Sequence, residues 1–192
     1  MQNLSTAAYI NRSKVINIKS ELLCREAEDD FFYFNKINSA YKKLRQAVEL
    51  SPFHLKSLIL LADICFIKGR IKKALELYKR AEEISASNAR ILSSIANCAQ
   101  VTGDYSGAIE YCNRAIENLN AENCNLYSQI IEIKINAYMM KKNYKQAYIT
   151  FIQAQNVLDS TSLKMIYNIS YEKLNEKINL QKKLQQSRLQ IV

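Results

Sequence analysis

The residues that most often carry catalysis or hold a metal are sparse in this chain. Its 192 residues contain one histidine, His54, and five cysteines without a CxxC pair. A metal site usually needs several histidine or cysteine ligands, and most acid–base mechanisms need a histidine beside a second group. Carboxylates are scattered, and the glycine-rich phosphate-binding and nucleophile-elbow motifs are absent. We therefore expect a non-enzymatic protein with no metal and no cofactor.

A different chemistry is suggested by short polar residues that recur at a fixed step. Asp29, Asp63 and Asn97 are 34 residues apart, and Asn136 follows after 39. Carboxylates and amides accept hydrogen bonds, and amides also donate them, so this polar row could bind the main chain of a peptide without reading its sequence. The competing interpretation is that the four side chains are merely solvated, and the sequence does not separate the two.

The same step organises most of the chain. Residues 55–88 and 89–122 align without a gap, and extending the period predicts further blocks at 21–54 and, after a five-residue insertion, at 128–161. Two alanines seven residues apart recur in the second half of every block. Small residues at this spacing allow antiparallel helices to approach closely. These alanines are Ala40, Ala47, Ala74, Ala81, Ala108, Ala115, Ala147 and Ala154.

Two glycines also fit the repeat pattern, and two charged residues depart from it. Gly69 and Gly103 occupy the same place in the central blocks, where glycine ends a helix with a positive φ. Glu28 stands where the first block should have a small residue. Lys134 stands where the fourth block should have a leucine, which predicts either a rotated helix or a lysine stem lying along apolar surface.

A 34-residue period with small residues at these places resembles the tetratricopeptide repeat (TPR), a helix–turn–helix unit that stacks into a solenoid. The resemblance covers residues 21–161 and implies an all-α solenoid of four antiparallel helix pairs. Outside it, we expect residues 1–20 to form a basic, partly mobile arm. Residues 162–192 are expected to form a helix that caps the fourth repeat and ends in a basic, glutamine-rich tail.

The resemblance also implies a function, because the concave face of a TPR solenoid, lined by the first helix of each repeat, is where such proteins bind partners. The chain would then be a protein–protein interaction scaffold or adaptor that holds a peptide or helix of a protein partner in this groove. The expected groove residues are Arg25, Asp29, Lys56, Ile59, Asp63, Phe66, Arg90, Asn97, Gln129, Asn136 and Met139.

Two branches of the family allow a closer comparison. Chaperone-binding TPR domains hold a C-terminal carboxylate with lysine, arginine and asparagine side chains. At the matching positions this chain has Asp29, which repels a carboxylate, and Leu60, which donates no hydrogen bond. This argues against recognition of the C-terminus of a heat-shock protein. A looser, architectural resemblance to the translocator chaperones of type III secretion leaves a client-specific chaperone as an alternative function.

The net charge of +9 raises nucleic acid or an anionic surface as another partner. Basic residues of the predicted second helices are interspersed with glutamates, however, and solvated helix exteriors give the same net charge. The cleanest positive segments are the ends, residues 1–20 and 177–192, neither of which contains an acidic residue. Binding of nucleic acid through these ends is therefore the weaker alternative.

Cysteine usage and hydropathy bear on the compartment. An odd number of cysteines, three of them at packing positions, predicts reduced thiols in a cytoplasmic protein. No run approaches 18 apolar residues, and the first dozen residues lack the apolar core of a signal peptide, so we expect no membrane insertion. Self-association through an uncovered end of the stack stays open, as does the identity of the partner.

Overall fold

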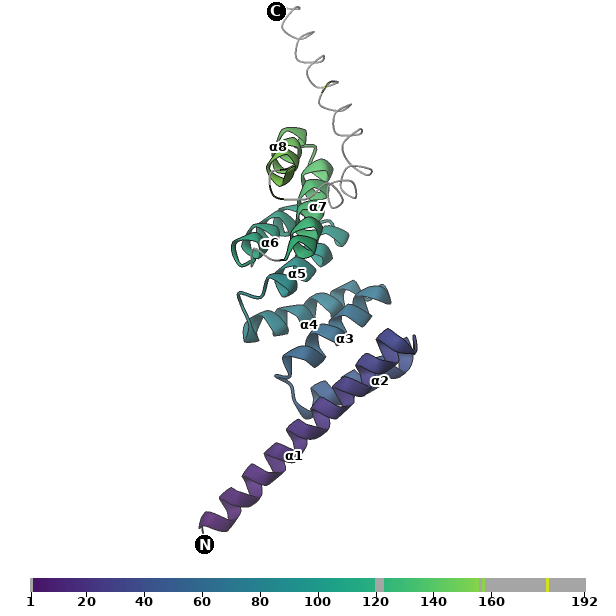
Figure 1. Cartoon of the computed structure of the whole chain (residues 1–192), viewed down its shortest axis with the longest axis vertical. Coiled ribbons are helices and arrows are strands. Elements are labelled where there is room, and N and C mark those ends of the chain that lie inside the picture. The colour runs from purple at the N-terminus through teal and green to yellow at the C-terminus, as the bar shows by residue number, and fades with distance from the viewer. Residues whose placement is uncertain (1, 120–122, 156, 158–178, 180–192) are drawn as a thin grey trace, which may run out of the picture. The chain divides into compact units, whose positions relative to one another are not determined.

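The computed structural model describes residues 2–119, 123–155, 157 and 179, with side chains from residue 14 onward. The elements of this part of the chain are all helical (Figure 1). They are α1 (Gln2–Glu28), the π-helix η1 (Asp29–Tyr33), α2 (Ile37–Leu50), α3 (Leu55–Ile67), α4 (Ile71–Ile84), α5 (Ala89–Val101), α6 (Tyr105–Glu117), α7 (Cys124–Met140) and α8 (Tyr144–Gln155).

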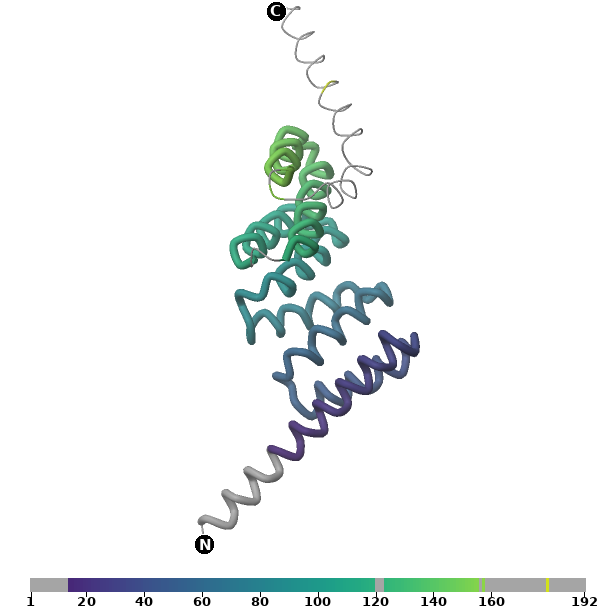
Figure 2. Tube along the Cα trace, viewed as in Figure 1, coloured from purple at the N-terminus to yellow at the C-terminus, as the bar shows by residue number. Residues whose placement is uncertain are grey.

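The helices belong to two compact units, each described by itself. The first unit contains α1 to α4 and the second contains α5 to α8. Within a unit, consecutive helices joined by short turns pack against each other as pairs, α1 with α2, α3 with α4, α5 with α6 and α7 with α8 (Figure 2). The all-α solenoid that the repeat pattern predicts is confirmed.

The recurrent alanines lie buried in these helix pairs. All eight have an exposed fraction of 0%. Because no side chain extends beyond Cβ at these points, the paired helices can pack closely, and a larger residue would overpack the contact at a cost of roughly 1–3 kcal/mol. The residue midway between the two alanines is buried as well. These residues are Leu44, Tyr78, Cys112 and Phe151.

Each repeat turns from its first to its second helix with one residue in the left-handed region. Gly69 (φ 72°) and Gly103 (φ 85°) do so as predicted, and Asn35 (φ 50°) and Lys142 (φ 58°) occupy the equivalent places in the outer repeats. In the last three repeats the N–H of this residue bonds to the carbonyl three residues back, and the next N–H bonds to the carbonyl five residues back. Asparagine tolerates this conformation, whereas the Cβ of Lys142 conflicts with it.

Helix α1 is longer than the first helix of the other repeats. It runs from Gln2 to Glu28 without a break, so the segment that we expected to form an arm, residues 1–20, is helical from residue 2 onward and continuous with the first helix of the first repeat. Ser20 Oγ donates a hydrogen bond to the carbonyl of Ala47 at 3.0 Å and ties α1 to the end of α2. The expected capping helix at 162–192 lies outside the described residues, apart from residue 179.

The first repeat also departs from the pattern at its turn. In η1 the N–H of Phe34 bonds to the carbonyl of Asp29 at 3.1 Å, one residue wider than an α-helical bond. The buried Asp30 carboxylate accepts a hydrogen bond from Ser39 Oγ at 2.7 Å and pairs with Lys43 Nζ at 2.9 Å. Because both donors belong to α2, Asp30 anchors the wide turn to the second helix of the repeat.

The fourth repeat accommodates its inserted residues within a helix. Helix α7 begins at Cys124, so most of the insertion lengthens this helix rather than the loop before it. Lys134 is half-buried, and burial lowers the pKa of its ammonium group. The neighbouring Ile135 is fully buried. Of the two alternatives for Lys134, the structure therefore favours a stem that lies along apolar surface.

Replacing Lys142 with glycine should stabilise the fold. Glycine adopts a positive φ without the steric penalty of a Cβ, so we expect a gain of about 1 kcal/mol in the free energy of unfolding. Chemical denaturation followed by circular dichroism measures it. Lys142→Ala, which removes the side chain but keeps Cβ, is the control and should bring no such gain. An equal gain in both variants would contradict the backbone explanation.

The Asp30 anchor should make stability depend on pH in the acid range. The hydrogen bonds from Ser39 and Lys43 lower the pKa of Asp30, whereas an unfolded aspartate titrates near ~3.9. Its stabilising contribution is therefore complete above about pH 4 and is lost as the pH falls through the lowered pKa.

We expect Asp30→Asn to melt several degrees below the wild type at pH 7, and the difference to shrink below pH 4. Thermal melts between pH 7 and pH 2 provide the measurement. The matched control is Asp29→Asn, because Asp29 is the adjacent carboxylate and is exposed. If the two variants melt alike at pH 7, Asp30 is not an anchor.

Candidate functional site

The second unit brings residues of two first helices together, one from each of its repeats. Helices α5 and α7 contact each other. The start of α5 is set by Asn88, whose side chain accepts hydrogen bonds from the N–H groups of Arg90 and Ile91 at 3.1 and 3.3 Å. Leu92 of α5 and Ile130 of α7 are buried in one cluster. This apolar contact fixes which faces of the two helices remain free.

Between α5 and α7 lies a hollow of about 290 Å³, here called the polar hollow. Each helix contributes residues three, four and seven positions apart, which is the spacing of one helix face. The volume is at the small end of the range for ligand pockets, about 300–1,000 Å³, and suits one side chain or a short piece of main chain. The lining residues are Ser93, Ser94, Asn97, Gln100, Gln129, Glu132, Ile133 and Asn136.

Hydrogen-bonding groups dominate this lining. Seven of its eight residues carry a hydroxyl, amide or carboxylate, and Glu132 is the one acidic residue of the lining. The side-chain oxygen of Gln100, Oε1, is buried and accepts no hydrogen bond from the described residues. An unsatisfied buried acceptor costs roughly 1–3 kcal/mol.

Three of the expected groove residues, Asn97, Gln129 and Asn136, meet in the polar hollow, and two of them belong to the polar row. Two others in the same unit do not line it. Arg90 lies in the first turn of α5 and is exposed, and Met139 packs against the buried cluster between α7 and α8. The sequence pattern missed Gln100 as a lining residue, although it lies three residues after Asn97 on the same helix face.

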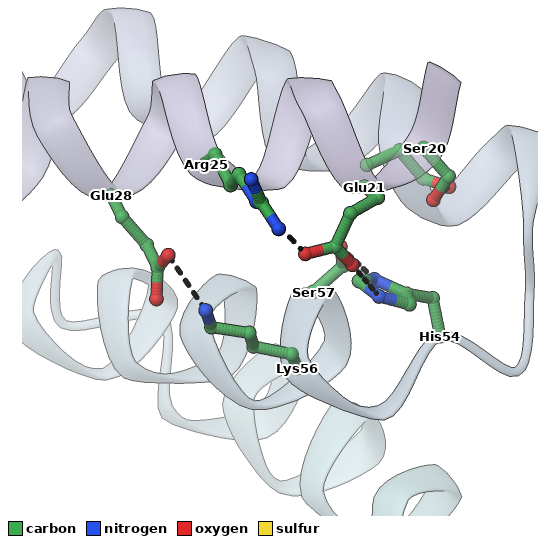
Figure 3. Close-up of polar contacts among 8 residues, drawn as sticks. Ser20, Glu21, Arg25, Glu28, His54, Lys56 and Ser57 are labelled. Carbon is green, nitrogen blue, oxygen red and sulfur yellow. Dashed lines mark hydrogen bonds and ion pairs between the residues drawn. The ribbon is translucent and has the colours of Figure 1, made fainter. Parts of the chain in front are cut away.

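In the first unit, two expected groove cations form ion pairs with α1 (Figure 3). Lys56 Nζ is 2.8 Å from a carboxylate oxygen of Glu28, and Arg25 Nε is 3.3 Å from Glu21. The ion pair with Lys56 explains how Glu28 occupies a place where the repeat usually has a small residue. Both cations are thus engaged within the unit.

The remaining first-unit members are dispersed. Asp63 accepts a hydrogen bond from the hydroxyl of Tyr78, which connects α3 to α4. Asp29 is exposed in η1, and Ile59 and Phe66 are half-buried on α3. The amide pair of the second unit, Asn97 and Asn136, is the part of the polar row that shares one cavity.

A second polar cluster surrounds the single histidine, and the sequence did not predict it. His54 Nε2 lies 2.9 Å from Glu21 Oε2, and His54 Nδ1 lies 2.6 Å from Ser57 Oγ (Figure 3). Acid, histidine and serine in contact are also the components of a hydrolase triad. Ser57, however, is fully buried, so its hydroxyl is closed to a substrate carbonyl. The cluster connects α1 to the start of α3. Glu21 lies 33 residues before His54, and only the packing of the two helices reveals the contact.

The cysteines and the helix hydropathy add two observations. All five cysteines are free thiols, and Cys24, Cys65, Cys98 and Cys112 are buried. Burial raises the pKa of Cys112 to about 12. Within the described residues, no three side chains of the histidine, cysteine, aspartate or glutamate type are placed to hold a metal. None of the described helices is both long enough and apolar enough to span a membrane.

The paired helices, the buried alanines and the left-handed turns define a helical-repeat protein, and comparison with known proteins identifies its family. The tetratricopeptide repeat family matches residues 29–89. The BBSome complex member BBS4 of Bos taurus is 27% identical over 106 residues, which are 55% of this chain and 20% of the relative. The chain thus spans about a fifth of that relative's length.

Solved structures agree on the fold. A tetratricopeptide repeat protein from Parabacteroides merdae has a TM-score of 0.69 at 19% identity. The match covers 84% of this chain and 60% of the Parabacteroides chain. The MamA protein has a TM-score of 0.66 at 13% identity, and the match covers 86% of this chain and 89% of MamA. Residues 29–89 thus belong to the tetratricopeptide repeat family, and the chain has the tetratricopeptide repeat fold. Proteins of this family are generally non-enzymatic scaffolds for protein–protein interaction.

The burial of Ser57 predicts how the histidine cluster responds to a serine-directed reagent. A fluorophosphonate forms an adduct with an activated, accessible serine, so we expect none at Ser57 in the native chain. Peptide mass spectrometry after incubation checks this. An adduct on Ser57 that disappears in His54→Ala would contradict this view and indicate a hydrolase-type site.

Proposed function

We propose that this protein is an interaction scaffold that holds an extended or helical segment of a protein partner against the polar hollow between α5 and α7. The observation that carries the proposal is the pairing of Asn97 and Asn136, equivalent residues of successive repeats, in one cavity. Each amide can donate one hydrogen bond and accept another, which matches the N–H and C=O groups of a peptide main chain.

The arrangement of α5 and α7 supports binding without a large ordering cost. The two helices are held by the cluster around Leu92 and Ile130, and the side chain of Asn88 caps α5. A site on packed helices keeps its shape in the free protein, so less of the interaction energy is lost in ordering it. The hollow would therefore be a preformed binding site for the partner segment.

The relative named as a BBSome complex member supports a role within a multi-protein assembly. Its similarity covers 106 residues of this chain, and the segment with the hollow would supply one contact of such an assembly. A partner that becomes soluble only when it is co-produced with this chain would instead favour a client-specific chaperone.

The proposal is tested by partner recovery. The tagged chain is used to purify partners from an extract of its own cells, and mass spectrometry quantifies them. We expect Asn97→Ala combined with Asn136→Ala to reduce recovery of the specific partner at least tenfold, because two amide contacts are lost together.

The matched control replaces two exposed asparagines of the same unit, Asn113→Ala combined with Asn125→Ala. This variant should recover the partner as the wild type does, and circular dichroism should show the same helicity in all three proteins. Full recovery by the Asn97 and Asn136 variant would overturn the proposed function.

A further inference from the structure

We propose that the polar hollow accepts a positively charged side chain of the partner, specifically the guanidinium group of an arginine. The inference rests on the proposed function, because it specifies which chemical group of the bound segment enters the hollow. Two features of the lining carry it: the charge of Glu132 and the buried oxygen of Gln100.

Among the described residues, no cation compensates the carboxylate that Glu132 places in the hollow. No lysine or arginine is among the lining residues. Seven ion pairs join carboxylates to basic groups elsewhere in the described part of the chain, and none of them includes Glu132. On a protein with a net charge of +9, the hollow is thus a local site of negative charge. A half-buried carboxylate of this kind is stabilised by a cation.

Gln100 adds a directional requirement. Its Oε1 atom is buried and has no donor among the described residues, so a rotation of the Gln100 side chain that turned this oxygen toward the hollow would let it accept an N–H from the occupant. Glutamate side chains and peptide C-termini bring only acceptors and would be repelled by Glu132. An apolar side chain would leave both the Glu132 carboxylate and the Gln100 amide oxygen without a partner. A cationic donor satisfies them together.

Among cationic donors, guanidinium fits the distribution of acceptors best. It is planar and carries five N–H groups, so one arginine can bond to a carboxylate while its other N–H groups reach amide oxygens. Glu132 supplies the carboxylate, and Gln100 and Asn97 supply amide oxygens on the facing helix. Ile133 offers an apolar surface for the methylene stem of the arginine. A lysine ammonium is a compact charge and would engage fewer of these groups at once.

The charge of the hollow is thus opposite to that of a groove that binds a carboxylate, because such a groove is lined by cations. Arg90, the expected basic groove residue of this repeat, lies outside the hollow lining, in the first turn of α5. The hollow therefore presents acceptors and a carboxylate rather than cations. This is why we expect the occupant to be a basic residue of the partner rather than its C-terminus.

The test compares two probes of the same shape and different charge. N-acetyl-arginine amide and its neutral analogue N-acetyl-citrulline amide are titrated into the full ¹⁵N-labelled chain and followed by NMR. We expect saturable shifts of the side-chain amide signals of Asn97, Gln100 and Asn136 with the arginine probe. The citrulline probe should bind at least tenfold more weakly, because it cannot form the charged contact with Glu132.

Glu132→Gln keeps the shape of the residue and removes its charge, and it should weaken arginine binding about tenfold. Glu110→Gln is the matched control, since Glu110 is an exposed carboxylate on α6 outside the hollow, and its affinity should equal that of the wild type. The comparison of arginine with citrulline needs no variant, so it decides the question even if Glu132→Gln fails to fold.

Three results would overturn the inference: no saturable shifts, equal affinity for arginine and citrulline, or equal weakening by Glu132→Gln and Glu110→Gln. These failures are separate from a failure of the proposed function. If partner recovery depends on Asn97 and Asn136 while citrulline binds as well as arginine, the scaffold proposal stands and the charged occupant is wrong. If recovery is independent of the two asparagines, the scaffold proposal fails.

Discussion

The structure depends on the close packing of helices at paired alanines. At these sites each second helix presents only a methyl group to its neighbours, and all eight methyl groups are fully buried. The residue between the alanines can be as different as Cys112 and Phe151, and both of these side chains are fully buried. Two residues per repeat therefore specify the pairing, and the remaining faces are free to vary.

Polar side chains gather on the helix faces that the alanine contacts leave free. In the first unit, charged and polar side chains of α1 and α3 bond to each other, as Lys56 does with Glu28 and His54 does with Glu21. In the second unit, the facing residues of α5 and α7 are mostly short or neutral, and they surround a hollow. The same helix face is used for internal cohesion in one unit and left available for a ligand in the other.

The two exceptional turns show how the backbone tolerates departures from the repeat. Asn35 and Lys142 take the left-handed conformation that Gly69 and Gly103 adopt in the central repeats, and at Lys142 the turn makes the same two hydrogen bonds as at the glycines. In the first repeat a π-helix precedes this turn, and the buried Asp30 holds it to α2. The turn conformation is thus a property of the repeat, and the residue type adapts to it.

The number of helix pairs, the alanine contacts and the glycine turns were readable from the sequence, because they follow from local spacing that recurs every 34 residues. Tertiary packing decided the rest. The contact of His54 with Glu21 joins residues 33 positions apart, at the start of α3 and within α1. Periodicity could align Asn97 with Asn136, but only the packing of α5 on α7 placed both in one hollow with Gln100.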